Sequence, residues 1–228
     1  MLLSQSLKDL FYPPLCLSCE QWLIKGESDL CFACLSQLPE TRYPIDIQNP
    51  VAQILWGRIP LKYACSFLMF NALNKTHDIL HNIKYKGNKE LAKFLGQYYA
   101  NVYLKQLEPL QIDEIIPIPL HPRKKKMRGF NQAEYFAQGM AETLRCICNA
   151  KRLKRTNFTA TQTKKSRAER WENVREIFTC SAPELTSKNI LVVDDVITTG
   201  ATIESAAKAL LLKNPKSIGV ITLAFAND

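Results

Sequence analysis

The fold is decided by one stretch of the sequence, Leu191-Val-Val-Asp-Asp-Val-Ile-Thr-Thr-Gly-Ala-Thr202. Its apolar first half predicts a buried strand, and the apolar spacing that follows it predicts a helix. Asp194 and Asp195 therefore come at the carboxyl end of a strand, where α/β sheets bind their ligands. The next residues lead into a helix N-terminus, whose backbone N–H groups attract anions. They are Thr198, Thr199, Gly200, Ala201 and Thr202.

Two carboxylates followed by such an anion cradle predict a site for a ribose 5-phosphate, because ionised carboxylates accept hydrogen bonds from sugar hydroxyls. An ordinary strand-to-helix turn is the alternative interpretation. A single Asp at the helix cap would suffice for such a turn, whereas this loop carries two acids and three threonines.

The remaining chain predicts a parallel α/β sheet, because strand, helix, strand, helix and strand alternate. Strands are expected at 63–71 (as a strand pair or an edge strand), 113–119, 188–195 and 217–225, and helices from residues 88, 131 and 202. Asn131 is an expected N-cap, with Glu134 completing a capping box. In the helix after Asn88 the expected inward face is Leu91, Phe94, Leu95, Tyr98 and Val102. Residues 38–60 contain four prolines and are interpreted as a linker or an irregular wrap.

Four of the eight cysteines form two identical pairs, Cys16-Leu-Ser-Cys19 and Cys31-Phe-Ala-Cys34. Paired knuckles of this kind place four thiolates around one ion, and Zn²⁺ favours a tetrahedral all-sulfur site. The first residues lack the basic region of a secretory signal, so disulfides are not expected. We therefore predict a structural zinc site in a segment of about 40 residues that is too small to build its own core.

Composition excludes a mostly disordered chain, since 46% of the 228 residues are hydrophobic and 22% are charged. This length allows one domain with an appendage or two small domains. Because no apolar run reaches the roughly 18 residues of a membrane-spanning helix, a soluble cytoplasmic protein is expected.

The net charge of +9 is unevenly distributed, because residues 121–175 hold 15 Lys and Arg against 4 Asp and Glu. Such a segment indicates an anionic partner, either a phosphorylated small molecule or nucleic acid. A solvated surface that keeps the protein soluble is the simpler alternative.

LVVDDVITTGAT resembles the phosphoribosyl pyrophosphate (PRPP) motif of type I phosphoribosyltransferases. Three further blocks are similar to the ComF (ComFC) family. They are Ile116-Pro-Ile-Pro-Leu-His-Pro-Arg-Lys-Lys-Lys-Met-Arg-Gly-Phe-Asn-Gln132, Arg155-Thr-Asn-Phe-Thr-Ala-Thr-Gln162 and Arg170-Trp-Glu-Asn-Val-Arg-Glu-Ile-Phe178. With the four cysteines, the resemblance covers nearly the whole chain.

The resemblance implies a phosphoribosyltransferase-like domain at 46–228, with a parallel sheet and flanking helices, and a zinc finger at 1–45. It implies a PRPP-binding protein that acts in the cytoplasmic step of DNA uptake during bacterial natural transformation. In PRPP enzymes the paired acids, here Asp194 and Asp195, bind the ribose hydroxyls. The loop from Thr198 to Thr202 binds the 5-phosphate. Mg²⁺ bridges the pyrophosphate and ribose oxygens. Other cytoplasmic competence proteins are implied partners, and a membrane is not.

Two functions stay open for the basic segment. In an active phosphoribosyltransferase with an unknown acceptor, residues 121–128 would neutralise the departing pyrophosphate, and 151–170 would form a mobile hood over the site. Arg128 is the expected catalytic arginine. In the alternative, the protein is a single-stranded DNA-binding accessory with a catalytically silent PRPP or nucleotide pocket, and the same charges bind DNA. Aromatic side chains that could stack on bases are Phe130, Tyr135, Phe158 and Trp171. A packed or capping role for each of them is the alternative.

Overall fold

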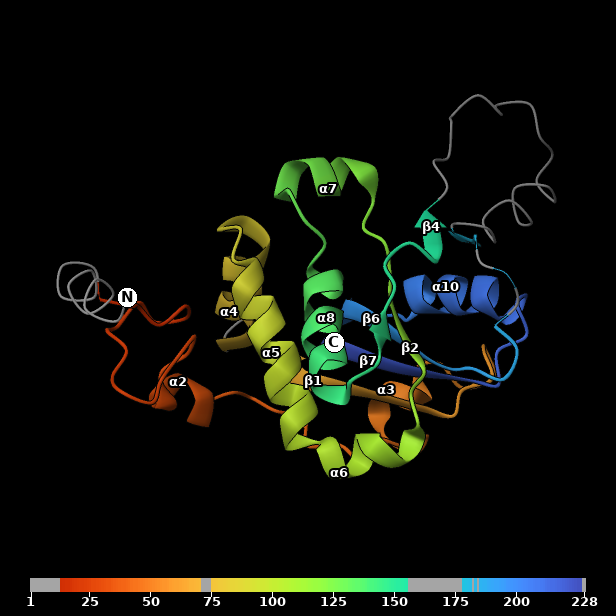
Figure 1. The fold of residues 1–228 in the computed structure, drawn as a ribbon, viewed down its shortest axis with the longest axis horizontal. Helices are drawn as coiled ribbons and strands as arrows, with labels where there is room; N and C mark the ends of the chain where they lie inside the picture. The colour runs from red at the N-terminus through yellow and green to blue at the C-terminus, as the bar shows by residue number, and fades with distance from the viewer. Residues whose placement is uncertain (1–12, 71–74, 156–177, 182, 184, 227–228) are drawn as a thin grey trace.

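The structure, a computed structural model, describes residues 13–70, 75–155, 178–181, 183 and 185–226. Its centre is a five-stranded parallel sheet in the order β1-β7-β6-β2-β3 (Figure 1). The strands are β1 (Tyr63–Phe70), β2 (Glu114–Pro117), β3 (Ile147–Cys148), β6 (Asn189–Ile197) and β7 (Ser217–Ala226). The predicted parallel sheet is confirmed, and β1 is an edge strand. The central position of β6 explains its apolar sequence, because both faces of such a strand are covered.

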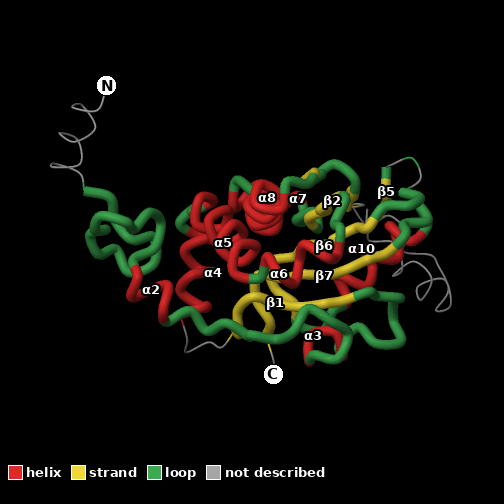
Figure 2. The backbone as a smooth tube through the Cα atoms, turned by 60° about the horizontal axis from the view of Figure 1, so that its bottom comes forward, coloured by secondary structure: helices red, strands yellow, loops and turns green. Residues whose placement is uncertain are grey.

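Helices cover both faces of the sheet, as Figure 2 shows. α4 (Lys75–Tyr85), α5 (Lys89–Val102) and α8 (Gln132–Leu144) share one core, whereas α3 (Pro50–Gln53) and α10 (Ala201–Leu211) share the other. Leu191 and Val193 of β6 pack into the first core, and Ile190 and Val192 pack into the second. This alternation is the period of two that a strand imposes.

α5 and α8 cross closely because each has a glycine at the contact. A Cβ atom on Gly96 would lie 2.1 Å from the carbonyl oxygen of Phe136, and one on Gly139 would lie 2.0 Å from that of Lys93. The apolar spacing in the sequence predicts the helix α5 correctly, but it does not predict every residue of the buried face of α5. Tyr99 is fully buried, whereas Val102 is 50% exposed.

Residues 38–60 form a strap along the outer edge of β1, so the wrap is the arrangement found. Glu40 and Asp46 make isolated antiparallel bridges to β1. Asn49 is 3% exposed, and its side-chain amide donates to the carbonyl oxygen of Ala64 at 2.6 Å. The strap thus covers an edge that would otherwise present unpaired backbone groups.

The basic segment after β2 is a short helix, α7 (Pro122–Arg128). The ring nitrogen Nδ1 of His121 accepts from the backbone N–H of Arg123 at 3.2 Å and so begins the helix. Asn131 precedes α8 as predicted, but the expected capping box is wrong. The Asn131 side chain makes no cap, because its amide donates to the carbonyl oxygen of Ile118 at 2.9 Å.

A buried carboxylate begins β2 at the end of the strand opposite the paired acids. Glu114 is 0% exposed and accepts from Arg152 at 2.6 and 3.0 Å and from Lys188 at 3.1 Å. Burial alone would raise the pKa of Glu114, but the hydrogen bonds and charges of Arg152 and Lys188 outweigh it and lower this pKa. The stability that this cluster contributes is therefore lost as the pH falls through the folded-state pKa.

The other described elements are short. They are α2 (Phe32–Ser36), α6 (Leu104–Leu107), the 3-10 helix η1 (Glu108–Leu110), and the antiparallel pair β4 (Leu153–Arg155) and β5 (Phe178–Cys180). Within the described part of the chain, no helix is both long and apolar enough to cross a bilayer.

Candidate functional site

The two acids lie at the carboxyl end of β6, in the centre of the sheet. Asp194 Oδ1 accepts from the backbone N–H of Asp195 at 2.9 Å, and Asp195 Oδ1 accepts from that of Val196 at 2.8 Å. Lys84, in the last turn of α4, places its Nζ 3.2 Å from Asp195 Oδ2. Both side chains of this ion pair are about one-fifth exposed, at 19% and 20%. A cation from a distant helix therefore balances one of the two charges.

For the second acid, Asp194, no such ion pair is found among the described residues. Burial, and then the charge of Asp195, raise the pKa of Asp194 well above its usual range. The N–H of Asp195 and the charges of Lys84 and Arg155 oppose this rise without cancelling it. Hydrogen-bond donors stabilise the ionised form of a carboxylate whose pKa is raised, and sugar hydroxyls are such donors.

The strap, residues 38–60, contacts the loop after β6. Gly200 has a φ of +73°, and a Cβ atom there would lie 2.8 Å from Leu55 Cδ2, so only glycine fits this position. Arg58 Nη1 donates to the carbonyl oxygen of Thr199 at 2.5 Å, and its Nε donates to Glu204 of α10 at 2.8 Å. These contacts fix the backbone and leave Thr198, Thr199, Ala201 and Thr202 exposed to solvent.

The end of β2 lies beside these acids. The backbone N–H of Ile118 donates to the carbonyl oxygen of Val193 at 2.8 Å, and Ile118 in turn is held by Asn131. Arg128, at the end of α7, is half-buried and has its guanidinium carbon 5.9 Å from the ring centroid of Tyr85. The other basic residues of α7 are exposed; they are Arg123, Lys124, Lys125 and Lys126.

A cavity of about 530 Å³ opens between α7, the start of α8 and β4. It begins at Pro119 and Leu120, just beyond β2, and includes Glu134. Its cationic lining consists of Lys125, Lys126, Lys154 and Arg155. The size and charge suit a small anionic ligand.

The aromatic and hood predictions have mixed outcomes. Phe130 is 8% exposed and packs edge-on against Tyr135, with their ring centroids 5.4 Å apart, so Phe130 has the packed role and not the role of stacking on bases. Phe158 and Trp171 lie outside the described residues. Of the expected hood at 151–170, only residues 151–155 are described.

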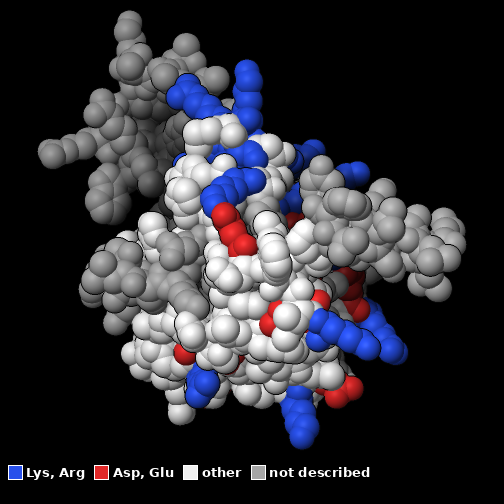
Figure 3. Space-filling view, turned by 90° about the vertical axis from the view of Figure 1, so that its left-hand side faces the viewer, with Lys and Arg blue, Asp and Glu red and all other residues white. Residues whose placement is uncertain are grey.

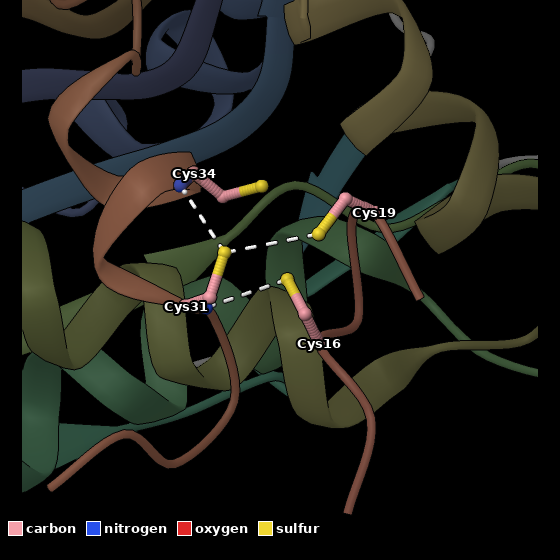
Figure 4. Close-up of side chains that lie close together, drawn as sticks. All are labelled: Cys16, Cys19, Cys31 and Cys34. Carbon is pink, nitrogen blue, oxygen red and sulfur yellow. Dashed lines mark hydrogen bonds between the residues drawn. The ribbon is translucent and has the colours of Figure 1, made fainter. Parts of the chain in front are cut away.

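The four cysteines of the two knuckles come together at one point (Figure 4). Their Sγ atoms all lie within 4.8 Å of one another, and those of Cys19 and Cys31 are 3.7 Å apart. Zn–S bonds of about 2.3 Å in a tetrahedral site place the sulfurs about 3.8 Å apart, so the cluster fits a zinc ion. Backbone N–H groups support it, because that of Cys31 donates to Cys16 Sγ and that of Cys34 donates to Cys31 Sγ, each at 3.4 Å. The arrangement has no position for a water ligand, which is typical of a structural site.

The thiol of Cys16 is already biased toward the thiolate. Burial opposes this bias, but hydrogen bonds from the backbone of Cys19, Cys31 and Ser18 together lower the pKa of Cys16 to about 7. A thiolate is the form that binds a metal ion.

The segment around the cysteines docks on α4. The side-chain amide of Asn82 donates to the carbonyl oxygen of Leu17 at 3.2 Å, and Lys86 Nζ lies 2.6 Å from Glu20 Oε1. Cys16, Cys31 and Cys34 are also continuous with the core formed by α4, α5 and α8. The helix that holds the cysteine segment is thus the one that sends Lys84 to Asp195.

Sequence reasoning missed Lys84 and Arg58. Lys84 had no signal, because the sequence analysis did not predict α4, the helix that carries it. Arg58 had none, since its partners Thr199 and Glu204 are more than 100 residues away in the chain.

Comparison with known proteins agrees with this fold. Residues 127–228 match the model of the phosphoribosyl transferase domain. The chain is 30% identical over 145 residues to DNA utilization protein YhgH of Escherichia coli O157:H7, with 62% of this chain and 63% of that protein covered. It is 33% identical over 142 residues to competence protein F of Haemophilus influenzae, with 61% of each chain covered. It is 26% identical over 208 residues to competence protein ComFC of Bacillus subtilis, with 84% of this chain and 82% of that protein covered.

The chain contains a phosphoribosyl transferase domain and is a homologue of the ComF proteins. The resemblance to ComF and the type I phosphoribosyltransferase-like fold are thereby confirmed. The match spans 63% of the length of YhgH, so what that protein does as a whole enters only as a proposal.

We predict that replacing Cys34 with Ser releases the metal from this ComF homologue. Purified wild-type protein should hold about one zinc ion per chain by elemental analysis, and Cys34→Ser should hold much less and unfold at a lower temperature, because an incomplete tetrahedral site loses most of its affinity. Cys180→Ser, which changes a cysteine outside the cluster, is the control and should keep its zinc. Full zinc content in Cys34→Ser would show that the cluster is not a metal site.

Proposed function

We propose that this protein binds PRPP at the carboxyl ends of β2 and β6, and that it acts in the cytoplasmic step of DNA uptake during bacterial natural transformation. One observation carries the proposal. A central strand of a phosphoribosyl transferase domain ends in two adjacent carboxylates and an exposed, glycine-anchored loop before a helix. The relatives named competence proteins supply the biological setting.

Each part of PRPP would meet a matching group. Asp194 and Asp195 would accept hydrogen bonds from the ribose hydroxyls. The N–H groups and hydroxyls of residues 198–202 would bind the 5-phosphate at the positive end of α10. Transfer of the ribosyl group expels pyrophosphate, so catalysis would consist mainly of neutralising the leaving group and positioning an acceptor. Arg128 is the proposed catalytic arginine, and the cavity of about 530 Å³ offers space for the acceptor.

Mg²⁺ is the proposed companion of PRPP. The carboxylates of Asp194 and Asp195 are hard oxygen ligands of the kind that Mg²⁺ binds beside phosphate groups. The ion would neutralise charge on the diphosphate. We also propose that the cysteine segment, residues 1–45, is a zinc finger packed on the rest of the chain and that residues 46–228 form the phosphoribosyltransferase-like domain.

A cytoplasmic location is consistent with the cysteines. Four clustered thiols stay available to a metal ion only in a reducing compartment. The proposed partners are PRPP, single-stranded DNA and other cytoplasmic competence proteins.

A second candidate function, binding of single-stranded DNA, is favoured by one surface. Three exposed rings, those of His77, His81 and Tyr85, follow one another along α4, with centroid separations of 6.2 and 5.0 Å. The ring of Tyr85 packs against the guanidinium group of Arg128 in α7. Figure 3 shows Lys and Arg gathered at the top of the molecule, where α7 lies. Exposed rings beside a basic surface are what sequence-tolerant binding of single strands requires.

We predict that the double variant Asp194→Asn with Asp195→Asn loses PRPP affinity while it stays folded. Two charge-assisted hydrogen bonds are lost, each worth about 1.5–3 kcal/mol, so the dissociation constant measured by calorimetry with Mg²⁺ should rise about 100-fold or more.

The single variant Asp194→Asn should unfold at a higher temperature than wild type at pH 8. The raised pKa of Asp194 means that ionisation destabilises the fold, and this penalty grows as the pH rises above the ordinary carboxyl pKa. The difference should shrink near pH 4.

The matched control is Glu90→Gln with Glu108→Gln, which removes two exposed negative charges away from the site. It should keep wild-type affinity. Equal PRPP affinity in the folded double Asn variant and in wild type would refute the proposed ribose site.

We predict that the α7 variant with Arg123, Lys124, Lys125 and Lys126 changed to Gln binds single-stranded DNA weakly and keeps its PRPP affinity. The slope of log affinity against log salt should become shallower by about 0.7 for each DNA phosphate that the variant no longer neutralises. A variant with Lys25, Lys62, Lys105 and Lys216 changed to Gln has the same net charge and should bind DNA like wild type. Unchanged DNA binding in the α7 variant would mean that this surface is only solvated charge.

A further inference from the structure

The ion pair between Lys84 and Asp195 lies deeper in the protein than an ordinary surface pair. The Nζ atom of Lys84 is 3.2 Å from Asp195 Oδ2, and the two side chains are only 19% and 20% exposed. Lys86, two residues later, pairs with Glu20 while both side chains stay 56% and 67% exposed. Burying two charges costs desolvation free energy that their attraction often does not recover. The stability that the Lys84 pair adds therefore does not explain its position at the candidate site.

The last turn of α4 fixes Lys84 in front of the acids. Ile83, the residue before it, is fully buried in the core, and Asn82 donates its side-chain amide to the cysteine segment. On the other side of Lys84, the ring of Tyr85 packs against the guanidinium group of Arg128. A cation is also favoured in the last turn of a helix, because that end of the helix dipole is negative. The ammonium group is thus part of the site in the protein alone.

The two acids differ in what their oxygens contact. Asp195 Oδ1 accepts from the backbone N–H of Val196, and its Oδ2 faces Lys84. Asp194 Oδ1 accepts from the backbone N–H of Asp195, and Asp194 has no ion pair among the described residues. Arg155 acts on Asp194 through its charge without forming an ion pair with it. Lys84 therefore cancels one of the two negative charges and occupies an oxygen that a divalent ion would need in order to bind both acids.

We infer that Lys84 is the resident cation of the acid pair: it takes the place of a divalent metal ion on Asp195, so that a ribose meets the acids without a metal and Mg²⁺ enters only with the diphosphate of PRPP. This inference rests on the proposed function. The ammonium group is a compact point charge, so it repels a second cation at the same carboxylate. It also halves the negative charge that a phosphorylated ligand meets. Lys84 is a positioning residue, because it acts through Asp195.

The first test measures the binding of Mn²⁺ alone to the zinc-loaded full chain, by electron paramagnetic resonance of the free ion. Mn²⁺ is a suitable probe because it prefers carboxylate oxygens, as Mg²⁺ does. Lys84→Gln should bind about one Mn²⁺ per chain at least about tenfold more tightly than wild type, because the repulsion is removed. Adding Asp194→Asn and Asp195→Asn should abolish this gain.

Two control variants separate the charge of Lys84 from a general effect of substitution. Lys84→Arg keeps a cation beside Asp195 and should bind Mn²⁺ like wild type. Lys86→Gln removes the neighbouring exposed ion pair with Glu20 and should also bind Mn²⁺ like wild type.

The second test measures the affinity for ribose 5-phosphate by calorimetry, with and without Mg²⁺. This ligand has no diphosphate, so the affinity of wild type should change by less than about twofold when Mg²⁺ is added. Lys84→Gln should bind it about tenfold more weakly without a divalent ion and should recover when Mg²⁺ replaces the missing cation. A purely structural ion pair would not create this metal dependence.

The outcomes separate this inference from the proposed function. If Lys84→Gln gains no Mn²⁺ affinity, or if Mg²⁺ raises the ribose 5-phosphate affinity of wild type and Lys84→Gln equally, the inference is wrong and the PRPP site stands. If wild type binds neither PRPP nor ribose 5-phosphate, the proposed function fails, and the Mn²⁺ measurement decides by itself whether Lys84 excludes a metal ion. Thermal unfolding checks the folding of each variant, and Lys84→Met replaces Lys84→Gln if the latter does not fold.

Discussion

Two like charges, side by side at the end of a buried strand, are the constraint on which the site depends. Pairing with β7 holds β6 at the two acids, each carboxylate accepts from the next backbone N–H, and the charge of Asp195 raises the pKa of Asp194. The protein supplies one close cation, Lys84, and leaves Asp194 with a raised pKa. Hydroxyl donors of a ligand would relieve this repulsion, and the N–H groups at the start of α10 would hold an anionic group of the same ligand apart from the two acids. A phosphoribosyl compound combines these two features.

The surrounding elements can be understood as supports for those two residues. In the strap, Arg58 donates to the carbonyl oxygen of Thr199, and Leu55 packs against Gly200. α4 carries Lys84 and Tyr85 to the site, while Asn82 in the same helix and Lys86 directly after it contact the cysteine segment. The cysteine cluster and the proposed PRPP site therefore share one helix. This arrangement gives the cysteine segment a structural part in the site although none of its cysteines reaches it.

Local patterns in the sequence predicted the features that depend on neighbouring residues. The sequence analysis found the paired acids, Gly200 and the four cysteines because strand, turn and knuckle patterns each involve only a few neighbouring residues. The sequence analysis did not predict the features that depend on contacts between residues distant in the chain. Lys84 and Arg58 meet β6 and its loop only through tertiary packing, and the approach of α5 to α8 depends on Gly96 and Gly139 together. The capping box failed for the same reason, because the carbonyl oxygen of Ile118 competes successfully for the Asn131 side chain.

The most direct test of the account is a crystal structure of the protein with PRPP and Mg²⁺. The account predicts ribose hydroxyls within hydrogen-bond distance of Asp194 and Asp195, and the 5-phosphate on the loop at 198–202. PRPP bound elsewhere on the molecule, with the carboxyl end of β6 still without ligand at saturating PRPP, would contradict it.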